Sequence, residues 1–403
     1  MYHYLVITAS YWGFTLTDGA LRMLVLFHFF KLGYSPFTLA FLFLLYEAAG
    51  ILANLGGGWL ASRFGIRRML ALGIGLQIAG LLFLSMLDPE WGAGLSVAWV
   101  MGAQGIAGIA KDITKTASKS AIKITSVDGN NQLFRWVAWF TGSKNATKGI
   151  GFFLGGLLLT TFGFSSALWS LAGFLAAIFI SCVLALPSGL GVAASSKSIR
   201  ELFSKSAGVN ILAAARIFMF GARDVWFVVG LPVFLYSAGW DFWAVGGFLA
   251  AWTIAYGGIQ AVAPSLVPRS SDGLRREVPA ARIWIVLLAL VPAFIFVALH
   301  YGKGLGIGRE QTVLVGLLVF GIPFAVNSSL HSYLILAYAG SRKAAEDVGF
   351  YYAANAAGRL MGTLLSGLLY QIGGLESCIL GSFVMLAICS SVTFMLPGAE
   401  TSE

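Results

Sequence analysis

Charged residues are scarce in this sequence. Lysine, arginine, aspartate and glutamate make up 11% of the 403 residues, whereas about a quarter of the residues of a soluble globular domain are charged. Hydrophobic residues make up 58%, which is more apolar side chain than one soluble core holds. The shortage of charge therefore excludes an ordinary soluble protein and indicates a chain that faces lipid.

Cysteine and histidine are also rare, with three and four copies. Cys182, Cys378 and Cys389 lie in apolar segments, form no CxxC pair and have no metal-ligand spacing. We therefore expect buried packing cysteines, no metal and no cofactor. The chain also contains no HExxH and no GxSxG motif and no paired aspartates at a membrane face, so we expect it not to be an enzyme.

Long hydrophobic runs, separated by short polar breaks, account for most of the chain. A run of about 20 apolar residues crosses a bilayer as a helix. No basic segment precedes the first run, so we expect it to be a retained span and not a cleaved leader. The predicted fold class is an all-α membrane protein with twelve transmembrane helices, at residues 4–30, 37–61, 69–87, 95–119, 136–162, 166–187, 207–236, 242–267, 280–301, 310–339, 347–371 and 376–397.

Basic residues alternate between the two sides of the membrane. One set of breaks is rich in lysine and arginine, and the other holds only Lys31, Lys303 and Arg309. The positive-inside rule places the richer set and both termini in the cytoplasm. Topology in an inner, cytoplasmic membrane thus explains much of the net charge of +9, and no nucleic-acid partner is needed.

The longest polar break covers residues 188–206 and divides the chain nearly in half. A weak echo at an offset of 206 residues places Asp18 on Asp224. Transporters are often built from two such repeats. We therefore predict two pseudo-symmetric six-helix bundles, at 1–187 and 207–403, joined by a cytoplasmic linker in a monomer that contacts the lipid bilayer.

The few charges inside the spans are mostly cations. Four acids (Asp18, Glu47, Asp112, Asp224) stand there against eight cations (Arg22, Lys111, Lys115, Lys144, Lys148, Arg216, Arg223, Arg359). A lipid-facing cation at mid-bilayer costs roughly 2.5–3.5 kcal/mol, so these side chains must face one another or a polar cavity. Pairing neutralises at most four cations, and the surplus predicts a positively charged cavity that selects anions.

The candidate site is drawn from these charges and their polar neighbours. Arginine binds phosphate or carboxylate bidentately and lysine acts as a point charge, so both together suit a substrate with more than one anionic group. The candidate substrate-binding residues are Arg22, Lys111, Lys115, Lys144, Asn145, Lys148, Arg223 and Arg359. The candidates for proton coupling are Asp18, Glu47, Asp112, Asp224 and His331.

Structural roles are open alternatives for several of these residues. Lys115 and Arg216 lie toward the cytoplasmic ends of their spans, where such side chains snorkel to the interface. Asp18 with Arg22, and Arg223 with Asp224, have the spacing of structural ion pairs. A satisfied core histidine is as good an interpretation of His331 as a proton carrier.

A glycine- and arginine-rich turn follows the second predicted span. The run Gly57-Gly58-Trp59-Leu60-Ala61-Ser62-Arg63-Phe64-Gly65-Ile66-Arg67-Arg68 resembles the loop signature of the major facilitator superfamily at Gly58, Arg63, Gly65, Arg67 and Arg68. Ser62 replaces the usual aspartate of that signature. The alternative is a basic cytoplasmic turn. Residues 151–156 resemble part of the superfamily's antiporter signature without its proline, and their glycines are also typical of helix packing.

Three strings narrow the resemblance. Residues 16–23 (LTDGALRM), 108–115 (GIAKDITK) and 141–149 (TGSKNATKG) look like the organoarsenical efflux permeases, the ArsJ-type branch of that superfamily. The resemblance implies export of 1-arseno-3-phosphoglycerate, arsenate resistance, and a functional partnership with the glyceraldehyde-3-phosphate dehydrogenase that makes this ester. Its phosphate and arsenate groups match the surplus of cations, and oxygen-bound arsenic needs no thiolate cluster.

Other functions compete with this one. The nearest is an organophosphate or other organic-anion antiporter of the same superfamily, which would need the same cationic cavity. A rival of another class is an intramembrane enzyme that acts on phosphorylated lipid, although the motifs of such a site are missing. For a transporter built from two repeats, we expect alternating access by rocking of the halves.

Overall fold

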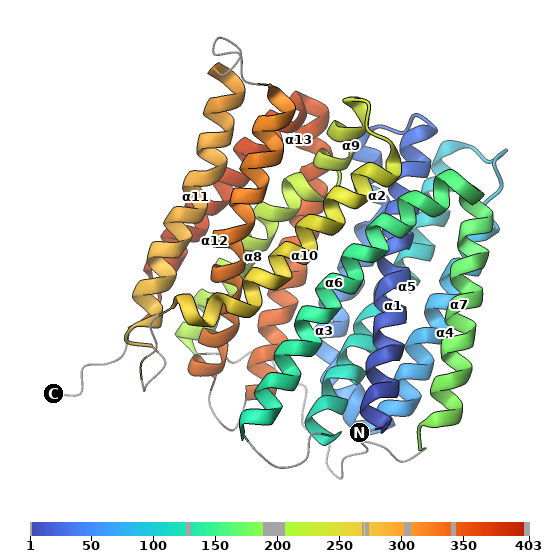
Figure 1. Cartoon of the computed structure of the whole chain (residues 1–403), viewed down its shortest axis with the longest axis horizontal. Helices are drawn as coiled ribbons and strands as arrows, with labels where there is room; N and C mark the ends of the chain where they lie inside the picture. The colour runs from blue at the N-terminus through green and yellow to red at the C-terminus, as the bar shows by residue number, and fades with distance from the viewer. Residues whose placement is uncertain are drawn as a thin grey trace. The chain divides into compact units, whose positions relative to one another are not determined.

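The structure, a computed structural model, describes residues 2–125, 130–187, 206–267, 270, 274–301, 308–339 and 344–398. The regular secondary structure of these residues is helical throughout. The helices are α1 (Tyr2–Lys31), α2 (Pro36–Leu42), α3 (Leu44–Phe64), α4 (Ile66–Ser85), α5 (Ala93–Thr125), α6 (Asn130–Phe162), α7 (Phe164–Ala185), α8 (Ala207–Phe227), α9 (Gly230–Ser237), α10 (Phe242–Leu266), α11 (Glu277–Tyr301), α12 (Arg309–Tyr338) and α13 (Ala344–Phe394) (Figure 1).

The described helices account for the twelve predicted spans. Nine segments are long and apolar enough to cross a membrane. One of them lies in α13, whose 51 residues are divided in the middle where Gly373 and Gly374 leave the helical conformation. α1 and α6 fall outside this apolar class but, with 30 and 33 residues, are longer than a span needs. These two helices also carry four of the twelve charges inside the spans.

Two predicted spans each consist of two helices. α2 and α3 are separated at Phe43, and α8 and α9 are separated at Val228 and Val229. Pro232, near the start of α9, has no amide to continue the helix. The Ser366 side chain of α13 accepts hydrogen bonds from the amides of Val229 and Gly230, at 3.2 and 3.1 Å, and so satisfies donors that the break leaves open.

The chain forms two compact units. Unit 1 contains Met1–Tyr34, Phe41–Ile199 and Trp240–Ile254, and unit 2 contains Ser35–Ala40, Arg200–Gly239 and Ala255–Glu403. Each unit thus contains most of one predicted half, together with a short segment of the other. The predicted linker lies outside the described residues except at its last position. There, Ser206 caps α8 by accepting a hydrogen bond from the amide of Val209.

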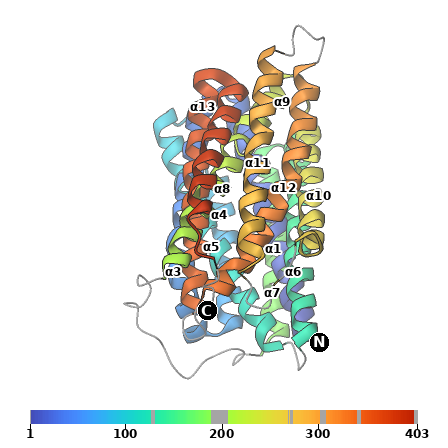
Figure 2. The ribbon, with the colours of Figure 1, turned by 90° about the vertical axis from the view of Figure 1, so that its left-hand side faces the viewer.

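Glycines let two pairs of helices approach closely within the units. α1 packs against α6 in unit 1, and α8 packs along α13 in unit 2 (Figures 1 and 2). A methyl group at Gly155 of α6 would lie 2.5 Å from the carbonyl oxygen of Ala20, and one at Gly362 of α13 would lie 2.6 Å from that of Gly221. Small residues have this role where lipid drives no helix association. The packing interpretation of the glycines in 151–156 is therefore confirmed.

Candidate functional site

Asp18 of α1 lies in a buried ion pair in unit 1. Its carboxylate accepts a hydrogen bond of 2.6 Å from the hydroxyl of Tyr46 in α3 and lies 3.6 Å from Nζ of Lys148 in α6. The close helix contact explains this meeting, because a methyl group at Gly19 would lie only 2.7 Å from the carbonyl oxygen of Lys148. The Lys148 side chain is 17% exposed and that of Asp18 is 4% exposed, so the cation is less enclosed than its acidic partner.

Asp224 of α8 has the corresponding arrangement in unit 2. Its carboxylate accepts hydrogen bonds from Nε of Arg223 at 2.7 Å and from Nε of Arg359 in α13 at 3.2 Å. In each half, therefore, an acid of the first span meets a cation of the fifth span. The expected Arg223–Asp224 pair is present, but the carboxylate is shared with a second arginine. Two arginines therefore share one carboxylate in this triad.

Arg22 is held in a second buried pair of unit 1. Its Nη1 lies 3.1 Å from Glu47, and the two side chains are 8% and 1% exposed. The rings of Phe43 and Tyr46 lie 5.0 and 5.7 Å from the guanidinium carbon. The expected Asp18–Arg22 pair is not formed, because each residue bonds a different partner. Because Glu47 and two aromatic rings enclose its guanidinium, a structural role is favoured for Arg22.

Asp112 holds two lysines on α5. It lies 2.5 Å from Nζ of Lys115 and 3.5 Å from Nζ of Lys111. Asn54 of α3 joins the cluster, since its oxygen accepts from Lys115 at 2.7 Å and its amide donates to Asp112 at 3.3 Å. Lys115 is thus bound inside unit 1. The Lys111 ammonium lies 3.9 Å from the ring centroid of Tyr46, so this tyrosine links the Asp18 and Asp112 clusters.

Arg216 of α8 is 4% exposed and is surrounded by protein groups. Its Nε donates to Oδ1 of Asn355 in α13 at 2.9 Å, and its Nη1 lies 3.5 Å from the carbonyl and hydroxyl oxygens of Ser328 in α12. The ring of Phe220 lies 3.9 Å from the guanidinium carbon. Arg216 is therefore a buried polar centre of unit 2, and a snorkelling side chain does not describe it.

His331 of α12 is fully buried, and neither of its ring nitrogens has a hydrogen-bond partner in the described part of the chain. A satisfied core histidine would have such a partner. Lys144 and Asn145 are partly buried on α6, one turn before Lys148. Next to them, Oγ of Ser143 accepts a hydrogen bond of 3.0 Å from the indole of Trp12.

Gly65 of the loop motif lies between α3 and α4, and Arg67 and Arg68 lie in the first turn of α4. Gly65 adopts φ 78, a left-handed conformation that favours glycine. Arg67 donates a hydrogen bond of 2.7 Å to the carbonyl of Val183 in the last turn of α7, where a cation also opposes the helix dipole. Arg68 is exposed. The side chains of residues 56–63, with Gly58 and Arg63 among them, lie outside the described part.

Sequence reasoning singled out Asn355 beside Arg359, but it missed Tyr46 and Ser328 as members of these clusters. Asn54 was visible as a polar residue in an apolar run, but its lysine and aspartate partners belong to another helix. We call the four acids and eight cations inside the spans the mid-span charges. Unit 1 contains five of the cations and three of the acids, and unit 2 contains three cations and one acid, so cations exceed acids by two in each unit. In the described residues, all four mid-span acids have cationic partners. Such an interior attracts anions.

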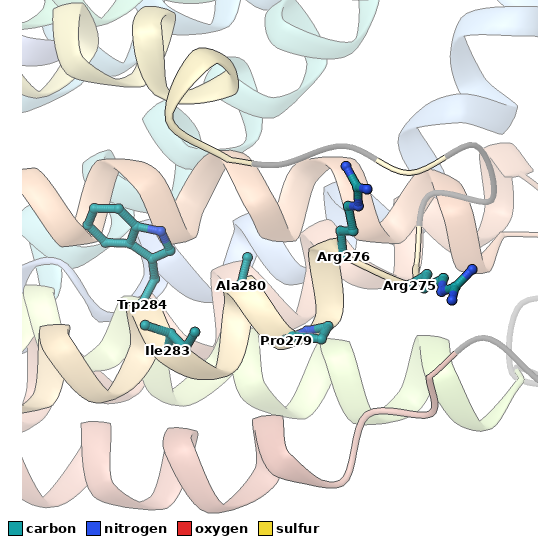
Figure 3. A pocket seen from close by; sticks show the side chains of 6 residues that line it. All are labelled: Arg275, Arg276, Pro279, Ala280, Ile283 and Trp284. Atoms are coloured by element: carbon teal, nitrogen blue, oxygen red, sulfur yellow. The ribbon is translucent and has the colours of Figure 1, made fainter.

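One open hollow of about 450 Å³ lies at the start of α11 in unit 2. Arg275 and Arg276 lie at one end of it and Trp284 at the other (Figure 3). Both arginines are exposed, and the hollow contains none of the mid-span charges. We therefore do not assign the candidate site to it. Among the described residues, no group of three histidine, cysteine or acidic side chains is placed to hold a metal.

Comparison with known proteins identifies the fold. The family model described as Major Facilitator Superfamily matches residues 4–345. A POT family transporter in complex with 5-aminolevulinic acid aligns with a TM-score of 0.71 and 14% identity, over 97% of this chain and 94% of that one. A D-xylose-proton symporter aligns with a TM-score of 0.72 and 12% identity, over 98% of each chain. A search of curated protein sequences found no match. The predicted fold class is confirmed.

Proposed function

The chain belongs to the major facilitator superfamily and is a multi-pass membrane transporter, and from this premise we propose that its cargo is a small organic anion exported from the cytoplasm. The observation that carries the proposal is the surplus of two mid-span cations in each unit. Burying more cations than acids is costly, so the retention of this surplus needs a reason. A cargo of opposite charge supplies one.

The ion pairs give the anion a way to bind. Lys148 and Arg359 are 17% and 18% exposed, whereas their partners Asp18 and Asp224 are 4% and 1% exposed. An incoming phosphate or carboxylate group can therefore reach the cation while the aspartate stays behind it. We propose that the aspartates act as internal counter-ions in the empty transporter and share or yield their cations when the anion binds. Alternating access then moves the bound anion across the membrane.

The finer proposal is that the cargo is 1-arseno-3-phosphoglycerate, exported to give arsenate resistance. Its support is the resemblance of residues 16–23, 108–115 and 141–149 to the organoarsenical efflux permeases, together with the match between a polyanion and the cationic spans. The three cysteines are buried and free, so they offer no grouped thiolates for trivalent arsenic. An inner-membrane location, cytoplasmic termini and a dehydrogenase that supplies the ester belong to this proposal.

Uptake into everted membrane vesicles tests the proposal. The ester is generated in situ from arsenate, glyceraldehyde 3-phosphate and NAD⁺, the hydride acceptor, by a glyceraldehyde-3-phosphate dehydrogenase, and arsenic inside the vesicles is measured. We expect ester-dependent uptake by the wild type and at least tenfold less by Lys148→Ala and Arg359→Ala. Arg309→Ala is the matched control, because it removes a cation from a more exposed pair with Glu376.

The same assay separates the rival cargo. Replacing arsenate by phosphate, or adding 3-phosphoglycerate alone, leaves an organophosphate but no arsenate ester. Uptake of these phosphates equal to that of the ester would identify a general organophosphate transporter. Absence of ester-dependent uptake in correctly inserted protein would remove the organoarsenical proposal. Full uptake by Lys148→Ala and Arg359→Ala would remove the two cations from the binding site.

A further inference from the structure

Arg216 is a deeply buried cation without a neutralising acid. The described residues place no carboxylate within ion-pair distance of its guanidinium, which contacts only amide, hydroxyl, carbonyl and aromatic groups. The mid-span cations Lys115, Lys148 and Arg359 each have an acidic partner. A buried charge of this kind is expensive unless something else compensates it.

The contact between the second and fourth spans differs between the two halves of the chain. In the first half, the second and fourth spans meet where Asn54 donates to the carboxylate of Asp112. In the second half, the corresponding spans α10 and α12 meet where Gln260 donates to the hydroxyl of Ser328 at 3.3 Å. Both contacts have a side-chain amide as donor, but the acceptor is the Ser328 hydroxyl in the second half and the Asp112 carboxylate in the first. Arg216 therefore lies beside a position where unit 1 has a negative charge and unit 2 has none.

Several donors converge on the Ser328 hydroxyl. Arg216, Gln260 and Tyr256 approach its oxygen at 3.5, 3.3 and 3.2 Å. These distances are long for hydrogen bonds to oxygen, and a hydroxyl offers only two acceptor lone pairs. An oxyanion with several oxygens fits such donors better than one hydroxyl does. His331, three residues further on the same face of α12, adds a buried ring whose nitrogens have no partner among the described residues.

Arg216 is also aligned with the Asp224 triad. It lies seven residues before Arg223, or about 10.5 Å along the same face of α8. Both guanidinium carbons lie over the Phe220 ring, at 3.9 and 4.9 Å from its centroid. Both arginines therefore contact one aromatic ring, and their guanidinium carbons lie less than about 9 Å apart, within the span of a three-carbon chain with an oxyanion at each end.

We propose that unit 2 holds two oxyanion subsites in series, one at Arg223 and Arg359 and a second at Arg216, Ser328 and His331. The second subsite binds the far oxyanion of a cargo that is anionic at both ends, and Phe220 packs against the uncharged middle. This inference deepens the proposed function, because it rests on an anionic cargo. It does not depend on whether that cargo contains arsenic.

Binding of matched probes to the purified full-length protein in lipid nanodiscs tests the second subsite. The probes are propane-1,3-diyl bisphosphate and propyl phosphate, and affinity is measured by calorimetry. We expect the wild type to bind the bisphosphate at least tenfold more tightly than the monophosphate. Arg216→Gln should lose that preference but keep its affinity for propyl phosphate, and Arg216→Lys should keep part of the preference.

Arg282→Gln is the matched control, because Arg282 is a partly buried arginine of unit 2 that donates to the Leu396 carbonyl and packs over the Phe394 ring, neither of which belongs to the subsite. It should keep the wild-type preference for the bisphosphate. Ser328→Ala, a smaller change, should reduce the preference and serves if Arg216→Gln does not fold. Equal losses for both probes in these variants, or an unchanged preference, would overturn the second subsite. Wild-type protein that binds neither probe would overturn it as well.

The outcomes for the subsite and for the cargo are distinguishable. An Arg216-dependent preference for the bisphosphate, without ester uptake into vesicles, would support the second subsite and remove only the arsenical. Ester uptake, together with a preference for the bisphosphate that Arg216→Gln leaves unchanged, would support the arsenical cargo and overturn the second subsite.

Discussion

Replacing Glu47 with glutamine leaves Arg22 buried without a counter-charge. The paired atoms lie 3.1 Å apart, and at an effective dielectric constant of about 20 two unit charges at that distance attract by about 5 kcal/mol. Removing one member of a buried pair typically costs about 3–5 kcal/mol. The rings of Phe43 and Tyr46 retain roughly 1 kcal/mol of cation–π attraction. We expect Glu47→Gln to lower the free energy of unfolding by about 3 kcal/mol.

Equilibrium unfolding in mixed detergent micelles, followed by circular dichroism, measures this change. The double variant Arg22→Met/Glu47→Leu removes both charges and should recover to within about 1 kcal/mol of the wild type, because apolar residues often replace a buried pair without loss. Glu376→Gln, in the more exposed pair with Arg309, should cost less than about 1 kcal/mol. A double variant as unstable as Glu47→Gln would refute the structural role of Arg22.

Three further predictions concern packing, counter-ions and cysteines. Gly362→Leu should force α8 and α13 apart and abolish ester uptake into vesicles. Gly258→Leu should leave uptake unchanged, because a Cβ added there meets nothing within 4 Å. Equal uptake by the two variants would contradict the close contact of α8 and α13. Asp224→Asn should bind propyl phosphate about tenfold more tightly, since charged hydrogen bonds contribute about 1.5–3 kcal/mol, and should turn over more slowly; weaker binding in calorimetry argues against the counter-ion role. A maleimide should label Cys182, Cys378 and Cys389 only after unfolding, because all three are buried, and mass spectrometry of labelled native protein checks this.

The spans were predictable because their physical causes are local. Scarce charge, long apolar runs and arginines in alternate breaks mark them, and the glycines near residue 373 fall between the last two predicted helices. The break at Val228 has one local signal, because Pro232 cannot continue a helix, but its own segment does not show what satisfies the freed amides. The amides it frees are satisfied by Ser366, from a helix far away in the sequence.

The charges of the candidate site were predictable, but their partners were not. Spacing placed Asp18 and Arg22 on one helix face, yet their partners Lys148 and Glu47 come from other helices. Arg216 shows the same limit. Its position toward one end of a span suited snorkelling, and only the packing of α8 against α12 and α13 shows that it is enclosed. Contacts between helices determine the role of each charge, and the spacing of residues along the sequence does not reveal those contacts.

Charge movement in proteoliposomes adsorbed on a solid-supported membrane tests the central claim most directly, because it reports whether mid-span cations bind and move an anion. The account predicts that propane-1,3-diyl bisphosphate evokes a transient current with the sign of negative charge entering the protein. It also predicts that the double variant Lys148→Gln/Arg359→Gln loses this current while Arg309→Gln keeps it. A wild-type protein that is silent toward phosphorylated anions, or a full current in the double variant, would contradict the account.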